Sequence, residues 1–148
     1  MSNKREPIVI KSLNARSLLC HFDIIDYLLQ ESNIDILCIC ETWLDSNVND
    51  KYIKISNFNV VRCDAGRGAG VCIYIRDGLS FTHICTGVDK VEGVEDVWIQ
   101  VQFRKFPSFI IGCVYRHPKA LVESYVYLST VFSNILLRKK KQFSSWVI

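Results

Sequence analysis

The sequence has no apolar run long enough to cross a membrane. A transmembrane helix needs about 20 consecutive apolar residues, and polar residues interrupt every apolar stretch of this 148-residue chain well before that length. Lys4 and Arg5 stand near the start without the apolar stretch that follows them in a signal peptide. We therefore expect an intracellular protein, nuclear or cytoplasmic and not secreted, whose 49% hydrophobic residues form a core rather than contact a membrane.

Metal-binding cysteine pairs are also missing, although the chain contains seven cysteines. No Cys-x-x-Cys pair occurs, and Cys38-Ile39-Cys40 has the wrong spacing for a zinc knuckle. An odd number of cysteines without a signal peptide favours a reducing compartment. Cys72 and Cys113 lie inside apolar runs, where a free thiol packs as a small apolar side chain. We therefore expect buried free thiols and no disulfide scaffold.

The glycine-rich segment 66–70 lacks the features of a nucleotide-binding loop. It has no Gly-Lys-Ser/Thr ending, and the β-rich residues 71–76 follow it, where a P-loop would open a helix. We expect a mobile connection between two strands. The net charge of +3 permits nucleic acid as a partner but does not require it.

The apolar pattern predicts a β-α-β unit at the start of the chain. Residues 8–10 and 34–40 are typical of strands, the second one buried. Between them, after a Ser17 N-cap, apolar residues recur at helical spacing at Leu18, Phe22, Ile25 and Leu29. A crossover helix of this kind joins parallel strands. Asn14 and Glu41 should therefore lie at equivalent ends of adjacent strands.

The rest of the chain is expected to form antiparallel strands followed by one helix. The predicted strands are residues 58–62, 71–76, 79–85, 95–103 and 109–115, with a tight turn at Asp77-Gly78 before the third of them. The helix is expected to bury Leu121, Tyr125, Leu128, Phe132 and Ile135. Residues 143–148 are apolar at their end and are typical of the start of a further strand.

Polar side chains follow three of the apolar runs. Asn14 follows the first, Glu41 the second, and Tyr115-Arg116 closes the last. In layered α/β folds, ligands and catalytic groups gather at strand ends. Phosphodiester hydrolysis needs a carboxylate-bound hard cation and donors around the phosphate. Glu41 suits the metal, Asn14 a phosphate or a neighbouring carboxylate, and Tyr115 and Arg116 the phosphate oxygens.

Four strings carry a resemblance to a known family. They are Leu13-Asn14-Ala15-Arg16-Ser17-Leu18, Asp35-Ile36-Leu37 leading to Glu41-Thr42-Trp43-Leu44, residues 70–76, and Gly112-Cys113-Val114-Tyr115-Arg116-His117-Pro118. In these strings and their order, nearly the whole chain from Ile8 resembles the endonuclease/exonuclease/phosphatase superfamily. It is most similar to the AP-endonuclease-like domain of non-LTR (LINE-type) retrotransposons.

The resemblance implies a four-layer α/β sandwich, in which two mixed β-sheets face each other with helices outside. It also implies nicking of DNA, held mainly through its phosphates, with Mg²⁺ (or Mn²⁺) as cofactor. Asn14 matches the family's first-strand active-site Asn, Glu41 its metal-binding Glu and Tyr115 its phosphate-contacting Tyr. Arg116 matches the Arg beside that Tyr in retrotransposon members.

Later motifs of the family do not occur in this sequence. Neither Gly-Asp-Phe-Asn nor Ser-Asp-His is present, and His21, His83 and His117 stand in other contexts. The resemblance therefore implies the N-terminal portion of a single domain over residues 8–148, behind a flexible N-terminus at 1–7. The C-terminal part of the domain would be missing, and the chain truncated and inactive.

Two other functions are compatible with the sequence. One is a phosphatase or sphingomyelinase of the same superfamily, and the other is a non-catalytic remnant that binds nucleic acid or a protein. The Tyr-Arg-His-Pro and Glu-Thr-Trp-Leu strings favour the DNA-cleaving branch over the first. Only the modest net charge supports the second.

Overall fold

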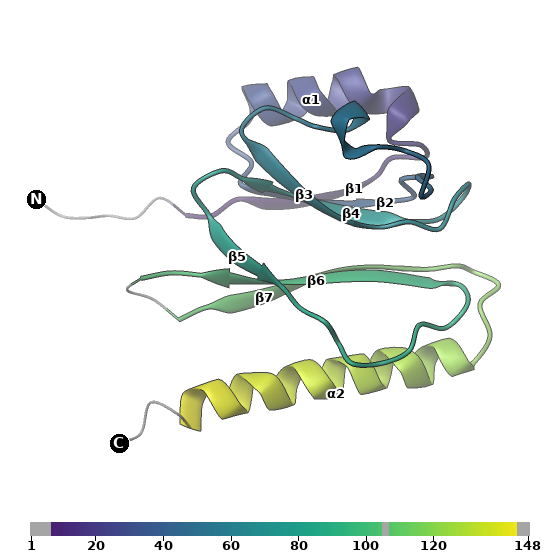
Figure 1. Ribbon diagram of the computed structural model, residues 1–148, viewed down its shortest axis with the longest axis vertical. Coiled ribbons are helices and arrows are strands. Elements are labelled where there is room, and N and C mark those ends of the chain that lie inside the picture. Colours follow the sequence, from purple (N-terminus) through teal and green to yellow (C-terminus); the bar gives the residue numbers. More distant parts are fainter. Residues whose placement is uncertain (1–6, 105–106, 145–148) are drawn as a thin grey trace, which may run out of the picture.

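Two β-sheets lie face to face in the computed structural model, and a helix covers the outer face of each (Figure 1). The structure describes residues 7–104 and 107–144. In chain order the elements are β1 (Ile10–Asn14), the 3-10 helix η1 (Leu19–His21), α1 (Phe22–Glu31), β2 (Ile36–Cys40), the 3-10 helix η2 (Asp50–Tyr52), β3 (Phe58–Cys63), β4 (Val71–Arg76), β5 (Ser80–His83), β6 (Val94–Gln102), β7 (Phe109–Arg116) and α2 (Glu123–Ser144). This arrangement confirms the predicted four-layer α/β sandwich.

The first sheet contains the predicted β-α-β unit. Its strand order is β1-β2-β4-β3; β1 and β2 are parallel, whereas the other pairs are antiparallel. The first strand is displaced from its prediction: it begins at Ile10 and runs through Asn14. Because β1 is an edge strand with mostly exposed side chains, backbone pairing to β2 decides its extent rather than apolar content.

The second sheet is antiparallel, with strand order β5-β6-β7. The tight turn predicted at Asp77-Gly78 does not close a hairpin: β4 and β5 lie in different sheets, so this turn leads the chain from one sheet to the other. The physical reason is that β4 already pairs with β2 on one side and β3 on the other. A strand with two partners has no free edge to offer a hairpin.

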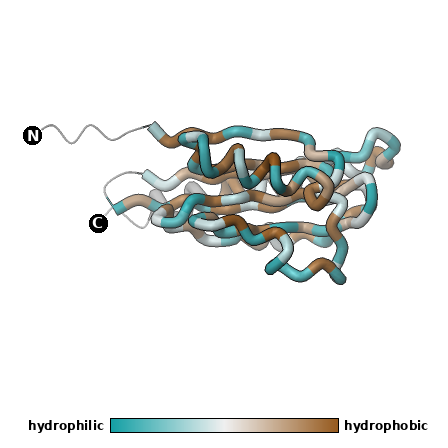
Figure 2. Tube along the Cα trace, turned by 90° about the horizontal axis from the view of Figure 1, so that it is seen from above, coloured by the Kyte–Doolittle hydropathy of each residue, from teal (hydrophilic) through white to brown (hydrophobic). Residues whose placement is uncertain are grey.

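Three apolar layers hold the sandwich together. One lies between α1 and the first sheet, one between the two sheets, and one between the second sheet and α2. The middle layer packs Ile36, Ile73 and Ile75 of the first sheet against Val97 and Ile99 of the second. Figure 2 shows hydrophobic segments along the strands and hydrophilic segments in the connections at their ends. Among the described residues, none of the helices has the length and apolar character needed to cross a membrane.

Helix α2 buries a face that overlaps only in part with the one predicted. Ile135 is buried and Leu128 partly buried, as predicted, but Tyr127 and Val131 complete the buried face, whereas Leu121, Tyr125 and Phe132 are exposed. The two stripes are adjacent and both apolar, so spacing alone did not separate them. The helix also covers Ser144, where the sequence predicted the start of a strand, and residues 145–148 of that prediction lie outside the described residues. The same is true of residues 1–6, most of the predicted flexible N-terminus.

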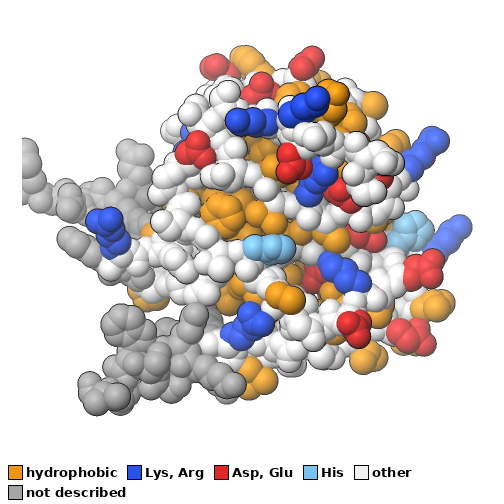
Figure 3. All heavy atoms as spheres, viewed as in Figure 1, with side chains coloured by type: hydrophobic (Ala, Val, Ile, Leu, Met, Phe, Trp, Pro, Cys, Tyr) orange, Lys and Arg blue, Asp and Glu red, His pale blue; other side chains and the backbone are white. Residues whose placement is uncertain are grey.

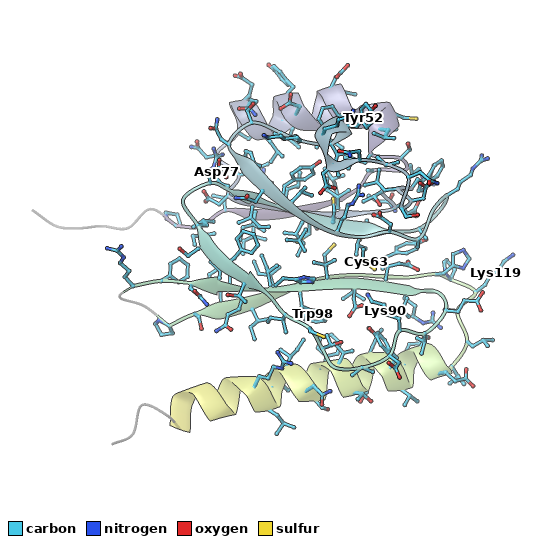
Figure 4. The ribbon with its side chains drawn as sticks, viewed as in Figure 1. Tyr52, Cys63, Asp77, Lys90, Trp98 and Lys119 are labelled. Carbon is cyan, nitrogen blue, oxygen red and sulfur yellow. The ribbon has the colours of Figure 1, made fainter. Side chains whose placement is uncertain are left out.

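A buried carboxylate helps to select the buried face of α2. Asp96, on β6, accepts hydrogen bonds from the Lys90 ammonium (2.6 Å), the Trp98 indole (2.7 Å) and the Tyr127 hydroxyl (3.0 Å). Trp98 points from the second sheet towards α2 (Figure 4). Because a buried carboxylate needs partners, this cluster favours the orientation that brings Tyr127, rather than Tyr125, to the sheet.

Replacing Gly112 with alanine should lower the free energy of unfolding by roughly 1–3 kcal/mol, the usual cost of overpacking. Gly112 is the register partner of Trp98, and a Cβ there would collide with the indole ring. Urea denaturation measures the change. Ser129→Ala, at an exposed position of α2, is the matched control and should change the stability by less than about 0.5 kcal/mol. An equally small change for Gly112→Ala would contradict the packing of Trp98.

Candidate active site

The ends of the two parallel strands bring Asn14 and Glu41 into contact. Asn14 is the last residue of β1, and Glu41 directly follows β2. The Asn14 side-chain amide donates a hydrogen bond to Glu41 Oε1 (2.8 Å), while its own carbonyl oxygen accepts one from the Arg16 backbone N–H (3.1 Å). The amide therefore fixes the orientation of the carboxylate and is itself fixed by the following loop.

The loops after these strands continue the parallel pairing in a strained form. Backbone hydrogen bonds join Ala15 N–H to the Cys40 carbonyl (2.9 Å) and Ser17 N–H to the Glu41 carbonyl (3.0 Å). Arg16, Ser17 and Glu41 nevertheless have positive φ angles of 44°, 92° and 53°. Non-glycine residues in this region cost about 1 kcal/mol or more each and cluster at functional sites. The hydrogen bonds between the two loops hold Glu41 in this conformation.

The glycine-rich connection between β3 and β4 packs against the loop that carries Glu41. Trp43 N–H donates to the Ala69 carbonyl (2.9 Å) and Thr42 N–H to that of Gly70 (3.2 Å). Gly70 has a φ of 90°, and a Cβ there would lie 2.5 Å from the Thr42 hydroxyl oxygen, so only glycine fits. The connection joins two strands as predicted, and these hydrogen bonds tie it to the site.

Tyr115 reaches the same region from the opposite sheet. It lies near the end of β7 and packs against the apolar layer between the sheets. Partial burial, followed by the negative charge of Glu41 and an interaction with that carboxylate, raises the pKa of the Tyr115 hydroxyl. A phenol of ordinary pKa, near 10, is already protonated at neutral pH, and the raised pKa of Tyr115 extends that range, so Tyr115 is a hydrogen-bond donor next to Glu41.

Arg116 is not brought to this cluster, contrary to the sequence expectation. Its guanidinium donates to the Ser124 hydroxyl (2.7 Å) and the Ala120 carbonyl (2.7 Å), and lies 4.2 Å from the centre of the Tyr125 ring. Successive side chains of a strand point to opposite faces, so Tyr115 faces the first sheet while Arg116 faces α2. In this structure the Arg116 guanidinium is therefore bound at the start of α2.

Glu95 is a further acidic residue at this end of the sandwich, which the sequence analysis missed. It lies opposite Tyr115 in the β6–β7 register and is only 8% exposed. Its carboxylate accepts a hydrogen bond from the Gly70 backbone, while Oε2 is buried without a partner. Burial raises the pKa of Glu95 despite that bond and the nearby charges of Lys90 and His117. The signal that the sequence analysis missed is the alternation of side chains along the strand. Glu95 lies two residues before Val97 and therefore shares its inward face.

A cavity of about 620 Å³ opens beside Glu95. Its walls come from the start of β6, the connection after β7 and the start of α2, including Gly93, His117 and Ser124. Lys119, which also lines it, extends from that connection at the edge of the molecule (Figure 4). Figure 3 shows charged side chains of both signs interspersed on the visible face, in line with the small net charge.

The predicted metal ion would need acidic side chains at this end of the sandwich. Across the described part of the chain, no group of three or more His, Cys, Asp or Glu side chains is arranged to hold an ion. Mg²⁺, however, keeps several waters and is usually bound by one or two carboxylates together with substrate phosphate. The half-buried Glu41, oriented by Asn14, fits that limited role.

Comparison with known proteins finds similarity to solved structures. No family model and no curated protein matches the chain. Among solved structures, it is similar to the 3′ phosphatase NExo from Neisseria bound to a product DNA hairpin, with 20% sequence identity and a TM-score of 0.47. The match covers 70% of this chain and 40% of that chain, so the similar region is less than half the length of the Neisseria protein.

Glu95→Gln should stabilise the protein near neutral pH. Because the folded state raises the pKa of Glu95 above its ordinary value of 4.5, the folded chain binds this proton more tightly than the unfolded chain. Its favourable contribution is therefore complete below 4.5 and is lost as the pH rises through the folded-state pKa. A neutral amide avoids that loss. Urea denaturation of both proteins at about pH 7 and below pH 4.5 measures the difference in their free energy of unfolding.

The difference between wild type and Glu95→Gln should shrink at the lower pH. Glu92→Gln changes an exposed carboxylate of the same cavity and serves as the control, with no such pH-dependent gain expected. A Glu95→Gln protein that is less stable than wild type at both pH values would contradict the assignment of Glu95 as a buried carboxylate that is costly to ionise.

Proposed function

We propose that this chain carries the phosphate-binding side of a DNA-cleaving site of the endonuclease/exonuclease/phosphatase type, with a retrotransposon-type endonuclease as the source of the domain. The observation that carries the proposal is the meeting of Asn14, Glu41 and Tyr115, which come from three strands and from both sheets. These are the residues that the four motif strings match to the family's Asn, Glu and Tyr.

Each of the three side chains has a definite part in this proposal. Glu41 would hold a divalent cation, Mg²⁺ or Mn²⁺, and the Asn14 amide would keep its carboxylate in a fixed orientation through their hydrogen bond. Tyr115, which is protonated at neutral pH, donates a hydrogen bond to a phosphate oxygen. The cation, when bound, polarises a phosphoryl oxygen and offsets the charge that develops on it. DNA is held mainly through its phosphates.

Activation of water is the step for which the three described histidines offer no positioned base. His21 is bound through Nδ1 to the Ser17 carbonyl oxygen, and His83 is exposed on β5. His117 lines the cavity beside Glu95, and its Nδ1 accepts the Lys119 N–H. We therefore propose that this chain binds the phosphodiester and cleaves it very slowly.

Magnesium should bind weakly by itself and more tightly together with DNA. Glu41 is one carboxylate, and the remaining oxygens must come from water and phosphate. Calorimetric titration of Mg²⁺ into the protein, with and without a short DNA duplex, measures this. Glu41→Gln should abolish the DNA-dependent binding, whereas Asp45→Asn, an exposed carboxylate in the same loop, should leave it unchanged.

The same titration followed by NMR locates the binding. Changes in backbone amide chemical shift should concentrate at Asn14–Arg16, Glu41–Trp43 and Tyr115. Tyr115→Phe should weaken DNA binding, whereas Tyr27→Phe, at an exposed position of α1, should not. Tight Mg²⁺ binding that survives Glu41→Ala would overturn the proposal. Shifts confined to another surface would favour the non-catalytic alternative, and phosphomonoester hydrolysis that depends on Glu41 would favour a phosphatase.

Nicking of supercoiled plasmid by the purified chain with Mg²⁺ should be negligible. Loss of a positioned general base or acid typically lowers the rate roughly 10²–10⁴-fold. A gel assay of plasmid relaxation measures the rate, with Glu41→Ala as the background control. Robust nicking by the wild-type chain that Glu41→Ala abolishes would show that this chain activates water by itself.

A further inference from the structure

Two thiols face each other across the space between the sheets. Cys40 is the last residue of β2, Cys113 lies on β7, and their Sγ atoms are 4.0 Å apart. Each sulfur also reaches the backbone of the opposite sheet: Cys113 Sγ lies 3.6 Å from the Ile39 carbonyl oxygen, and Cys40 Sγ lies 3.8 Å from that of Val114. The two strands therefore approach closely at this point.

The close approach is a property of these small side chains. Packed sheets are usually about 10 Å apart, a distance that a disulfide cannot cross, since its Cα atoms lie about 5.5–6 Å apart. Sulfur atoms that contact the opposite backbone in both directions indicate a much shorter separation here. Bond formation requires the two sulfurs to approach by about 2 Å, from 4.0 Å to the S–S bond length of about 2.05 Å.

Accessibility distinguishes Cys40 from Cys113. Cys40 is half-buried, next to the partly accessible Glu41, whereas Cys113 is buried. An oxidant therefore reaches Cys40 first and finds the Cys113 sulfur already in place, 4.0 Å away.

We propose that Cys40 and Cys113 are an oxidation site, at which hydrogen peroxide produces a disulfide between the two sheets. The Cys40 thiolate attacks one peroxide oxygen, the O–O bond breaks, and hydroxide leaves and takes up a proton to become water. The resulting sulfenic acid is attacked by the Cys113 sulfur, the S–O bond breaks, and a second water leaves with the thiol proton. Two thiols are thus oxidised while one peroxide is reduced to two waters.

The bond would join the strands that carry the candidate site. Cys40 precedes Glu41 directly, and its carbonyl oxygen accepts the Ala15 N–H (2.9 Å). Cys113 lies two residues before Tyr115 on the same face of β7. A cross-link that fixes the spacing of Glu41 and Tyr115 should change phosphate binding. That consequence rests on the proposed function, whereas formation of the disulfide does not.

The other thiols provide competitors and controls. Cys38 also interacts with Cys113, which lowers its pKa, but Cys38 is buried. Cys20 and Cys85 are exposed and can link two molecules. Cys63, which lies between the sheets in Figure 4, accepts a hydrogen bond from Lys90 (3.2 Å).

The test uses the full chain with Cys20→Ser and Cys85→Ser as the parent. Folded parent is treated with stoichiometric hydrogen peroxide, remaining thiols are alkylated, and the protein is digested without reduction for mass spectrometry. We expect an intramolecular Cys40–Cys113 cross-link, a mass loss of about 2 Da for the two hydrogens, and a higher urea midpoint that dithiothreitol reverses. Cys38→Ser and Cys63→Ser should keep the cross-link.

Cys40→Ser and Cys113→Ser should each abolish the Cys40–Cys113 cross-link. If Cys113→Ser unfolds the core, Cys113→Ala gives the same information, and Cys40→Ser changes only the half-buried partner. Dimedone should then trap a sulfenic acid at Cys40 in the Cys113 variant. A cross-link of Cys38 to Cys113, a product that is only a covalent dimer, or no loss of hydrogen in the parent would each overturn the proposal. A cross-link without any change in DNA binding would contradict the proposed function alone.

Discussion

The apolar layer between the two sheets is the interaction on which the rest of this structure depends. The first sheet alone aligns only Asn14 and Glu41, and Tyr115 reaches them because β7 packs against β2. The site therefore exists only in the packed sandwich. Since burial of apolar surface is the main favourable term in folding, the same contacts that stabilise the fold also bring the three side chains of the candidate site together.

The sequence predicted those parts of the fold that local pattern decides. The β-α-β unit followed from an apolar stretch, a helical stripe and a buried run, and it placed Asn14 beside Glu41 as the structure does. Pattern could not predict which strands pair: Asp77-Gly78 is typical of a hairpin, yet both edges of β4 are taken by other strands. Whether a strand has a free edge depends on the whole sheet, so a short stretch of sequence cannot show it.

The candidate site shows the same division between neighbours in sequence and neighbours in space. Arg116 directly follows Tyr115 in the sequence, but the alternation of a strand places its side chain on the opposite face, where it donates a hydrogen bond to Ser124. Glu95 belongs to no motif, yet the β6–β7 register sets it against Tyr115 and close to Gly70. The alternation of side chains along a strand could be predicted from the sequence for both Arg116 and Glu95. The pairing of Glu95 with Tyr115 across two strands could not.

The left-handed backbone at Glu41 has a consequence for laboratory evolution. Glycine or asparagine adopts a φ of 53° at lower cost than glutamate, so a selection that rewards thermal stability alone favours their appearance at this position. The first stabilising substitutions in such a selection would remove the carboxylate that accepts a hydrogen bond from Asn14. Under the proposed function, such variants would have a higher melting temperature and bind phosphate less well. Stability and the proposed function would therefore select in opposite directions at a single backbone angle.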